Sequence, residues 1–380
     1  MGRRIAGTVF ALILLAGVAR AEEERAEQEE AVPRSALDEE IVVTVARFER
    51  DLRSTGASVS VVDATDLRDR QVTDVSEAIS IVPGAFISRG GPPGSSSSLF
   101  LRGAASNQVL VLLDGIPLND PTLGGQFNFY DLGSDNLEAI EVLRGSASTL
   151  HGSEAIGGVV HLRTLRGDGE PGMRFGVEAG SYHHLRAIVS GQGRVEDVDF
   201  SASLSRTGVE NDLENNRFDS LTASGRFGWR IAPGFEAFFS GRWVDSTAED
   251  PWAFPFGEQI EEDANITRDR RTAAAAVGVR HDLTEELRWS LTGTWTDIRS
   301  DLEDLGDNPG DPVELVSSSD ARVGTVQLLG EWRRTGIASE TDLAVMAGVD
   351  YRDERSKNRS ESAFGATPPI DETVRNTAVF

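Results

Sequence analysis

Residues 99–119 read LFLRGAASNQVLVLLDGIPLN, and this stretch decides the expected architecture of the first part of the chain. Its centre is the continuous apolar segment Val109–Leu113, which Asp114 and Gly115 end. An apolar run of this length is typical of a strand buried on both faces, and an Asp-Gly pair is typical of a turn. The stretch therefore predicts the central strand of a small mixed α/β unit.

The sequence around this strand predicts further short elements between about residues 55 and 165. Asp74 suits the N-cap of a helix over 75–82, with Glu77 at the third helical position and Pro83-Gly84 ending it. A second short helix is expected over 66–71. Loops rich in glycine and serine separate the elements. Additional strands are predicted at 58–63, 85–88, 99–102, 139–143 and 158–162.

From about residue 171 the pattern changes to strict alternation of apolar and polar residues, as in 235–243 and 287–295. Short connections at 231–234 and 282–285 alternate with long polar ones at 246–267, 302–319 and 353–372. The predicted strands are 173–182, 185–194, 198–207, 217–231, 235–245, 270–282, 286–299, 321–332, 341–352 and 373–380.

Alternation alone fits both a soluble β-sandwich and a membrane β-barrel. Alternating short turns and long loops favour the barrel, and so do aromatic residues toward the ends of the predicted strands, where membrane proteins form girdles at the lipid–water interfaces. These aromatic residues are Trp229, Trp243, Trp289, Trp295, Trp332 and Tyr351.

The N-terminus predicts export. A basic segment, an apolar run over 5–18 and the small residues Ala19 and Ala21 are typical of a signal peptide over 1–21, because the run is shorter than the roughly 20 residues of a membrane-spanning helix. Residues 22–54 begin with a highly charged tract and are expected to be disordered. A formal net charge of -25 argues against a nucleic-acid partner, and the absence of cysteine excludes disulfides.

At this point the sequence resembles the TonB-dependent outer-membrane receptors, and most of all their cobalamin-transporter branch. The resemblance rests on VSEAISIVPG at 75–84, on the stretch 99–119 quoted above, and on IEVLRGSASTLHGSEAIGGVVHL at 140–162. It implies an α+β plug domain (55–165) followed by an antiparallel transmembrane β-barrel that begins at 171 and has 22 strands in the complete family members. About ten strands are counted here, so we expect the chain to be the N-terminal part of a longer protein in the outer membrane of a Gram-negative bacterium.

The resemblance also implies functional residues. The segment Glu40, Ile41, Val42, Val43, Thr44, Val45 resembles the TonB box, which binds the partner TonB as an added strand. Alternatively, 41–45 is simply the first strand of the plug. Plug loops would contact a small-molecule ligand, although their Gly-Ser composition is also that of a plain surface loop. The ligand candidates are Arg89, Ser95, Ser97, Asn119, Gln126 and Asn128.

Two arginines in Arg-Gly steps, Arg102 and Arg144, would anchor the plug to acids of the barrel wall, or would be solvated arginines in a wet lumen. No cofactor is expected. Calcium in the outer loops is a weak possibility, with Asp212 and Asp219 as its candidate ligands. Other acids considered for this site are Glu210, Glu214, Asp245, Glu249 and Asp250.

The expected function is TonB-coupled import of a scarce large ligand, with cobalamin or another corrinoid favoured and a ferric siderophore or haem as the alternative. A passive outer-membrane pore is the alternative of a different class. An enzyme is not expected, because the sequence has no recognisable pairing of a nucleophile with a base and no cofactor-binding loop.

Overall fold

The computed structural model describes residues 42–43, 47–48, 50–51, 57–91, 93–130, 132–211, 215–253, 261–304, 315–338, 341–362 and 365–380. The predicted signal peptide, most of the charged tract, and Glu40, Ile41, Thr44 and Val45 of the TonB-box segment lie outside these residues. Val42–Phe380 form one compact unit. Among the described residues, no helix is both long and apolar enough to cross a membrane.

The first part of this unit is a five-stranded mixed sheet with the order β3-β8-β9-β6-β7. The central strand β6 (Val109–Leu113) is buried throughout and pairs in parallel with β9 (Gly158–Thr164), as its continuous apolar sequence predicts. The other strands are β3 (Val59–Asp63), β7 (Ile116–Pro117) and β8 (Leu137–Arg144), and a separate hairpin pairs β4 (Ala85–Arg89) with β5 (Ser97–Leu101).

Three short α-helices and three 3-10 turns connect these strands. Helix α2 (Ala64–Asp69) begins after the N-cap Asp63, two residues earlier than predicted, because the Asp63 carboxylate accepts hydrogen bonds from the backbone of Thr65 and Asp66. Helix α3 (Val75–Ser80) begins after the predicted N-cap Asp74. The remaining elements are α4 (Ser148–His151), η2 (Ser106–Gln108), η3 (Pro121–Leu123) and η4 (Ser153–Ala155).

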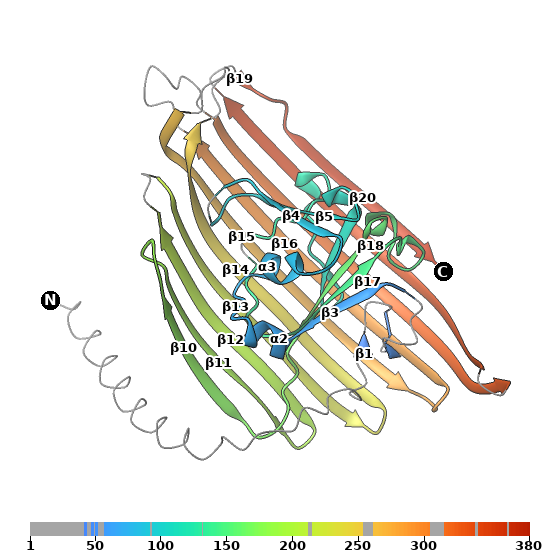
Figure 1. Ribbon diagram of the computed structural model, residues 1–380. Helices are drawn as coiled ribbons and strands as arrows, with labels where there is room; N and C mark the ends of the chain where they lie inside the picture. The colour runs from blue at the N-terminus through green and yellow to red at the C-terminus, as the bar shows by residue number, and fades with distance from the viewer. Residues whose placement is uncertain are drawn as a thin grey trace, which may run out of the picture. The chain divides into compact units, whose positions relative to one another are not determined.

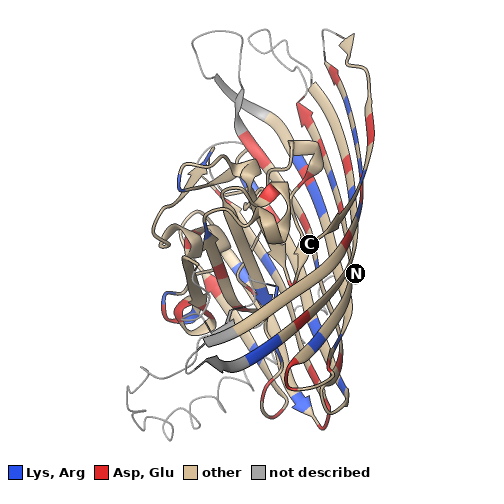
Figure 2. Ribbon diagram, turned by 90° about the vertical axis from the view of Figure 1, so that its right-hand side faces the viewer, with Lys and Arg blue, Asp and Glu red and all other residues tan. Residues whose placement is uncertain are grey.

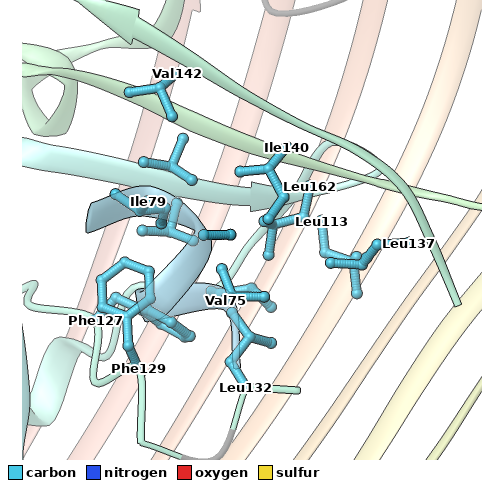
Figure 3. Packing of buried hydrophobic residues seen from close by; sticks show 14 of the residues in the cluster. Val75, Ile79, Leu113, Phe127, Phe129, Leu132, Leu137, Ile140, Val142 and Leu162 are labelled. Atoms are coloured by element: carbon cyan, nitrogen blue, oxygen red, sulfur yellow. The ribbon is translucent and has the colours of Figure 1, made fainter. Parts of the chain in front are cut away.

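The apolar core of the plug lies between this sheet and α3. Val75 and Ile79 on α3 face Ile140 and Leu162 from the sheet, and Phe129 closes the cluster, as Figure 3 shows. All five side chains have at most 1% of their surface exposed. The plug therefore has a close-packed apolar core, to which a few side chains from the second part of the chain also contribute.

The second part is one antiparallel sheet in which each strand pairs with the next along the chain, except the last, which pairs with the strand two before it (Figure 1). It confirms the predicted series of alternating strands. The strands are β10 (Gly172–Ala179), β11 (Leu185–Val195), β12 (Val198–Glu210), β13 (Arg217–Ala232), β14 (Phe235–Ala253), β15 (Glu261–Asp282), β16 (Leu287–Asp304), β17 (Leu315–Ala338), β18 (Thr341–Ser362), β19 (Gly365–Ala366) and β20 (Ile370–Val379).

The predicted long loops were wrong in extent, because much of each one continues the ladder. Strands β14 and β15 remain paired as far as Ala253 and Glu261, inside the predicted loop 246–267. Likewise, β16, β17 and β18 extend into 302–319 and 353–372. Polar sequence was read as loop here, although a strand exposed to water on both faces can be polar throughout.

The two faces of the sheet differ in chemistry. One face carries buried hydroxyl residues such as Ser203, Ser240 and Thr296. The opposite face exposes large apolar side chains such as Phe239 and Val277. A water-soluble protein buries apolar side chains and exposes polar ones, which is the opposite of this arrangement. An exposed apolar face is instead typical of the lipid-facing side of a membrane barrel.

Candidate functional site

The plug is held against the polar face of the sheet by arginines of the sheet. Arg186 on β11 pairs with Asp135 in the plug, and both side chains are almost fully buried. Ser205 on β12 donates a second hydrogen bond to the same carboxylate, at 2.6 Å. A buried carboxylate needs such compensation for its lost hydration.

The same polarity recurs further along the sheet. Arg242 on β14 donates to the Gly133 carbonyl at 3.1 Å, and Arg270 on β15 pairs with Asp120 at 3.3 Å. Arg352 on β18 pairs with Glu154 at 2.8 Å. In each case the sheet supplies the cation and the plug supplies the acceptor.

Two small apolar contacts complete this interface. Phe238, Ala274 and Ala276 of the sheet join the plug core cluster. Gly94, in the loop between β4 and β5, lies so close to the sheet that a β-carbon there would come within 2.7 Å of Phe218 and Ala248. Gly94 also has a φ of +94°, which favours glycine.

Arg102 and Arg144 have different partners from those predicted. Arg102 donates to the Arg144 carbonyl at 3.1 Å and to the Ser58 hydroxyl at 2.9 Å, while Arg144 donates to the Pro83 carbonyl at 3.0 Å. All of these acceptors lie in the plug. Among the described residues, the two arginines therefore connect plug loops to one another, and other residues form the ion pairs between plug and sheet.

The segment that follows the predicted TonB box is docked onto the sheet. Val42–Val43 (β1) pair with Arg50–Asp51 (β2), and between them Arg47 forms an ion pair of 2.8 Å with Asp350. The Arg47 guanidinium also lies 4.6 Å from the centre of the Phe380 ring. The predicted disorder over 22–54 was therefore wrong for Arg47 and Phe48.

Phe48 makes the second contact of this segment. Its ring is 8% exposed and lies 4.7 Å from the guanidinium of Arg288, which is itself paired with the buried Glu331. Cation–π and ion-pair contacts of this kind fix a short segment that has little apolar area of its own. Arg47 and Phe48 were missed because they precede a polar stretch that gives no sign of long-range partners.

Two predicted ligand residues have structural roles instead. The Asn119 side chain is buried and bonds to three backbone groups of the plug, those of Val109, Val111 and Gly125. Ser97 is also buried, and both its amide and its hydroxyl donate to the Asn128 carboxamide oxygen. Asn119 and Ser97 therefore stabilise the plug loops, and their role toward a ligand stays a prediction.

The remaining ligand candidates are more accessible. Arg89 and Gln126 are exposed, and Ser95 and Asn128 are half-buried. Arg89 reaches back to the Ser76 hydroxyl at 2.7 Å, beside Asp74. Burial raises the pKa of the Asp74 carboxyl above its ordinary value, while hydrogen bonds from Ser76 and the charge of Arg89 oppose this shift.

A cavity of about 700 Å³ lies elsewhere, between plug and sheet. It is lined by Arg47, Phe48, Arg288, Arg352 and Phe380, among others. None of the six predicted ligand residues lines it. The cavity therefore belongs to the end of the plug that carries the TonB-box segment.

The calcium prediction has no support in the described part of the chain. Asp219 forms ion pairs with Arg206 at 2.9 Å and Arg217 at 3.8 Å, which occupy its carboxylate, and Asp212 lies outside the described residues. No group of three or more acidic or histidine side chains among the described residues is placed to hold a metal ion.

Comparison with known families identifies the first domain. Residues 51–159 match the model of the TonB-dependent receptor plug domain. Among curated proteins, the chain is 30% identical over 243 residues to the vitamin B12 transporter BtuB of Vibrio vulnificus strain CMCP6, which covers 60% of this chain and 39% of that protein. With BtuB of strain YJ016 it is 26% identical over 356 residues, covering 90% and 54%.

Solved structures share the fold. The FpvA receptor of P. aeruginosa, bound to a heterologous ferric pyoverdine, superposes with a TM-score of 0.75 at 13% identity, over 89% of this chain and 50% of that one. The ferric yersiniabactin uptake receptor FyuA of Yersinia pestis gives a TM-score of 0.63 at 16% identity, over 86% and 61%.

The chain spans about half the length of the relatives and structures that it matches. Both curated relatives carry the name of vitamin B12 transporters. Residues 51–159 therefore form a TonB-dependent receptor plug domain, and the antiparallel strands that follow it share the fold of the solved receptor structures.

Proposed function

We propose that this receptor imports a large, scarce ligand across the outer membrane, with cobalamin or a related corrinoid favoured, and that TonB supplies the energy. The observation that carries the choice of ligand is the alignment with BtuB, which reaches 26% identity over 90% of this chain. The siderophore receptors match at 13–16% identity, a level that supports the fold alone.

The proposed coupling uses the two ends of the plug. Ligand binds at the loop that carries Ser95 and at the stretch around Gln126 and Asn128. TonB takes the segment from Glu40 to Val45 as an added strand. One edge of Val42–Val43 is paired with Arg50–Asp51, so TonB adds to the other edge or displaces β2.

The docked residues Arg47 and Phe48 connect these events. They hold the TonB-box segment to β16 and β18 through Arg288 and Asp350. A ligand that shifts the plug changes the free energy of this docking, and by reciprocity release of the segment changes ligand affinity. The neighbouring cavity gives the segment space to rearrange.

Growth tests identify the ligand. A host that lacks its own cobalamin receptor receives the complete gene and grows with cobalamin as the limiting nutrient, and a parallel host without siderophore receptors grows with ferric siderophore. Growth restored only by cobalamin supports the proposal. Growth restored only in the siderophore or haem arm replaces it with that ligand class.

Deletion of Glu40–Val45 separates an energised transporter from a passive pore. In the transporter, deletion abolishes uptake and leaves ligand binding at the cell surface intact. In a passive pore, uptake is unchanged.

A further inference from the structure

The exposed apolar face of the sheet ends at a line of charged side chains. Asp245 and Asp297 lie ten positions after Phe235 and Leu287, the first residues of β14 and β16. Tilted strands cross a membrane in about 9–11 residues. The first charged residue on this face therefore lies where the hydrocarbon layer would end.

The line runs obliquely across the strands. Asp245 on β14 and Arg271 on β15 are register partners. The first charged pair of β16 and β17, Asp297 and Arg322, lies one outward-facing position closer to the short-turn end of the strands. The pair Asp353–Arg375 on β18 and β20 lies one position closer again. Strands of a barrel tilt against its axis, so a level membrane surface has to cross the register in this way.

Aromatic residues follow the same line. Trp243, Trp295 and Tyr351 each precede by two positions the aspartate on the same strand, at 245, 297 and 353. All three side chains are on the outward-facing side of their strands. They lie near the ends of the shorter strands that the sequence predicted, and inside the longer strands of the structure. An aromatic girdle at the interface fits this position.

The charged line has a repeated construction in which one aspartate holds two arginines. Asp297 contacts Arg322 at 2.8 Å and Arg299 at 3.2 Å. Asp353 contacts Arg375 at 2.8 Å and Arg355 at 3.1 Å. Asp219 contacts Arg206 at 2.9 Å and has a looser ion pair with Arg217 at 3.8 Å.

Each of these Arg-Asp-Arg triads places two guanidinium groups beside one carboxylate in a chain whose overall charge is -25, and Arg299 also lies 3.7 Å from Asp320. The arginine side chains stay 51–65% exposed, so guanidinium donors that do not face the aspartate point outward. Figure 2 shows acidic and basic segments side by side on neighbouring strands of this sheet. Paired guanidinium groups bind phosphate oxygens well.

We infer that the Arg-Asp-Arg triads bind phosphate groups of lipids in the outer leaflet. The choice of the outer leaflet rests on the proposed function, in which TonB acts from the periplasm. The docked Phe48 lies against Arg288 at the short-turn end of the strands, which is therefore the periplasmic end. The triads lie toward the opposite end. Each aspartate holds two guanidinium groups in fixed positions, at the level where the apolar surface ends and a lipid headgroup would lie.

The test uses the complete receptor in detergent with added dioctanoyl phosphatidic acid, dioctanoyl phosphatidylcholine or inorganic phosphate, and counts bound lipid by native mass spectrometry. Phosphatidic acid should bind well above phosphatidylcholine. The substitution R322Q, in one triad, should weaken phosphatidic acid binding about fivefold, the effect of one cation near a lipid phosphate.

The matched control is R271Q. Arg271 is similarly exposed on the same line, and within the part of the chain that the structure describes Asp245 forms an ion pair with Arg271 alone, at 3.1 Å. An equal loss in R271Q and R322Q overturns the triad site in favour of general surface charge. Equal binding of both lipids, or displacement by millimolar inorganic phosphate, overturns the assignment to lipid phosphate. Cobalamin binding, measured on the same variants, reports independently on the proposed function.

Discussion

The plug and the sheet place their apolar side chains in opposite locations, inside the plug but on the exposed face of the sheet. The plug buries Ile79, Ile140 and Leu162 in its interior and turns polar groups outward. The sheet places hydroxyl residues such as Ser240 on the face toward the plug and exposes Phe239 and Val277 on the other. Most of the plug core comes from the plug itself, whereas the outer face of the sheet is apolar and suits lipid as its surroundings.

The boundary between the two parts is therefore polar, which matters for a plug that has to move. An apolar boundary would be stabilised in proportion to its whole area. The boundary here depends on a few directed contacts, such as Arg186–Asp135 and Arg270–Asp120, which can be exchanged for contacts with water when the plug shifts.

The largest effect is expected from breaking one of these boundary ion pairs. Asp120→Asn keeps the shape of the side chain but removes the charge that faces the buried Arg270. Loss of one partner of a buried pair costs about 3–5 kcal/mol. Hydrogen exchange of the loop around η3 should rise strongly, while the core of α3 stays protected.

The double variant Asp120→Asn with Arg270→Gln is the control for this prediction. It removes the uncompensated charge and should recover part of the protection. If the single variant exchanges like the wild type, the boundary is held by its apolar contacts and the contrast drawn above is wrong.

A somewhat smaller effect is expected inside the plug core. Ile140→Ala creates a cavity among fully buried side chains and should lower the free energy of unfolding of the plug by about 3 kcal/mol. Val326→Ala, on the lipid-facing side where 51% of the residue is exposed, should change it little. Equal losses, measured by thermal unfolding in detergent, would show that plug and sheet unfold as one unit.

The sequence predicted the elements of the plug and the alternation of the sheet because both follow from local patterns. The run Val109–Leu113 and the N-cap Asp74 needed no knowledge of distant partners. The strands β14 to β18 are longer than predicted. Their outer parts are polar on both faces, so they lack the alternation of apolar and polar residues from which the strands were predicted.

Site residues were harder to predict because partners far apart in the sequence decide their roles. Asn119 looked like a ligand donor, yet Val109, Val111 and Gly125 occupy its side chain. Arg47 looked like part of a disordered linker, yet its partner Asp350 lies about 300 residues away. Family resemblance located the plug but not these pairings.

A moderate effect is expected where the TonB-box segment meets the sheet. Arg47→Gln removes the ion pair with Asp350 and weakens docking by about 2 kcal/mol. The chain has no cysteine, so a single Val45→Cys reports exposure by its rate of reaction with a membrane-impermeant thiol reagent. That rate should rise in the Arg47 variant.

Arg102→Gln is the matched control, because among the described residues Arg102 donates hydrogen bonds to plug groups, the Arg144 carbonyl and the Ser58 hydroxyl. It should leave the Val45→Cys labelling rate unchanged. A rate that is the same with and without Arg47 would mean that Phe48 alone, or β1–β2 pairing, holds the segment.

The smallest effect is a pH dependence at the start of α3. The folded plug raises the pKa of Asp74 by burial, so the folded state binds this proton more tightly than the unfolded chain. This term stabilises the plug most at low pH and is lost as the pH rises from the ordinary carboxyl value of 3.8 through the raised folded value. Arg89 and the Ser76 hydrogen bonds limit its size.

Asp74→Asn isolates this term, because asparagine keeps the N-cap hydrogen bond to Ser76 while it cannot ionise. Amide exchange of α3, followed from pH 4 upward and corrected for intrinsic rates, should show the slope in the wild type and a flatter line in the variant. Identical slopes would mean that Arg89 cancels the effect of burial.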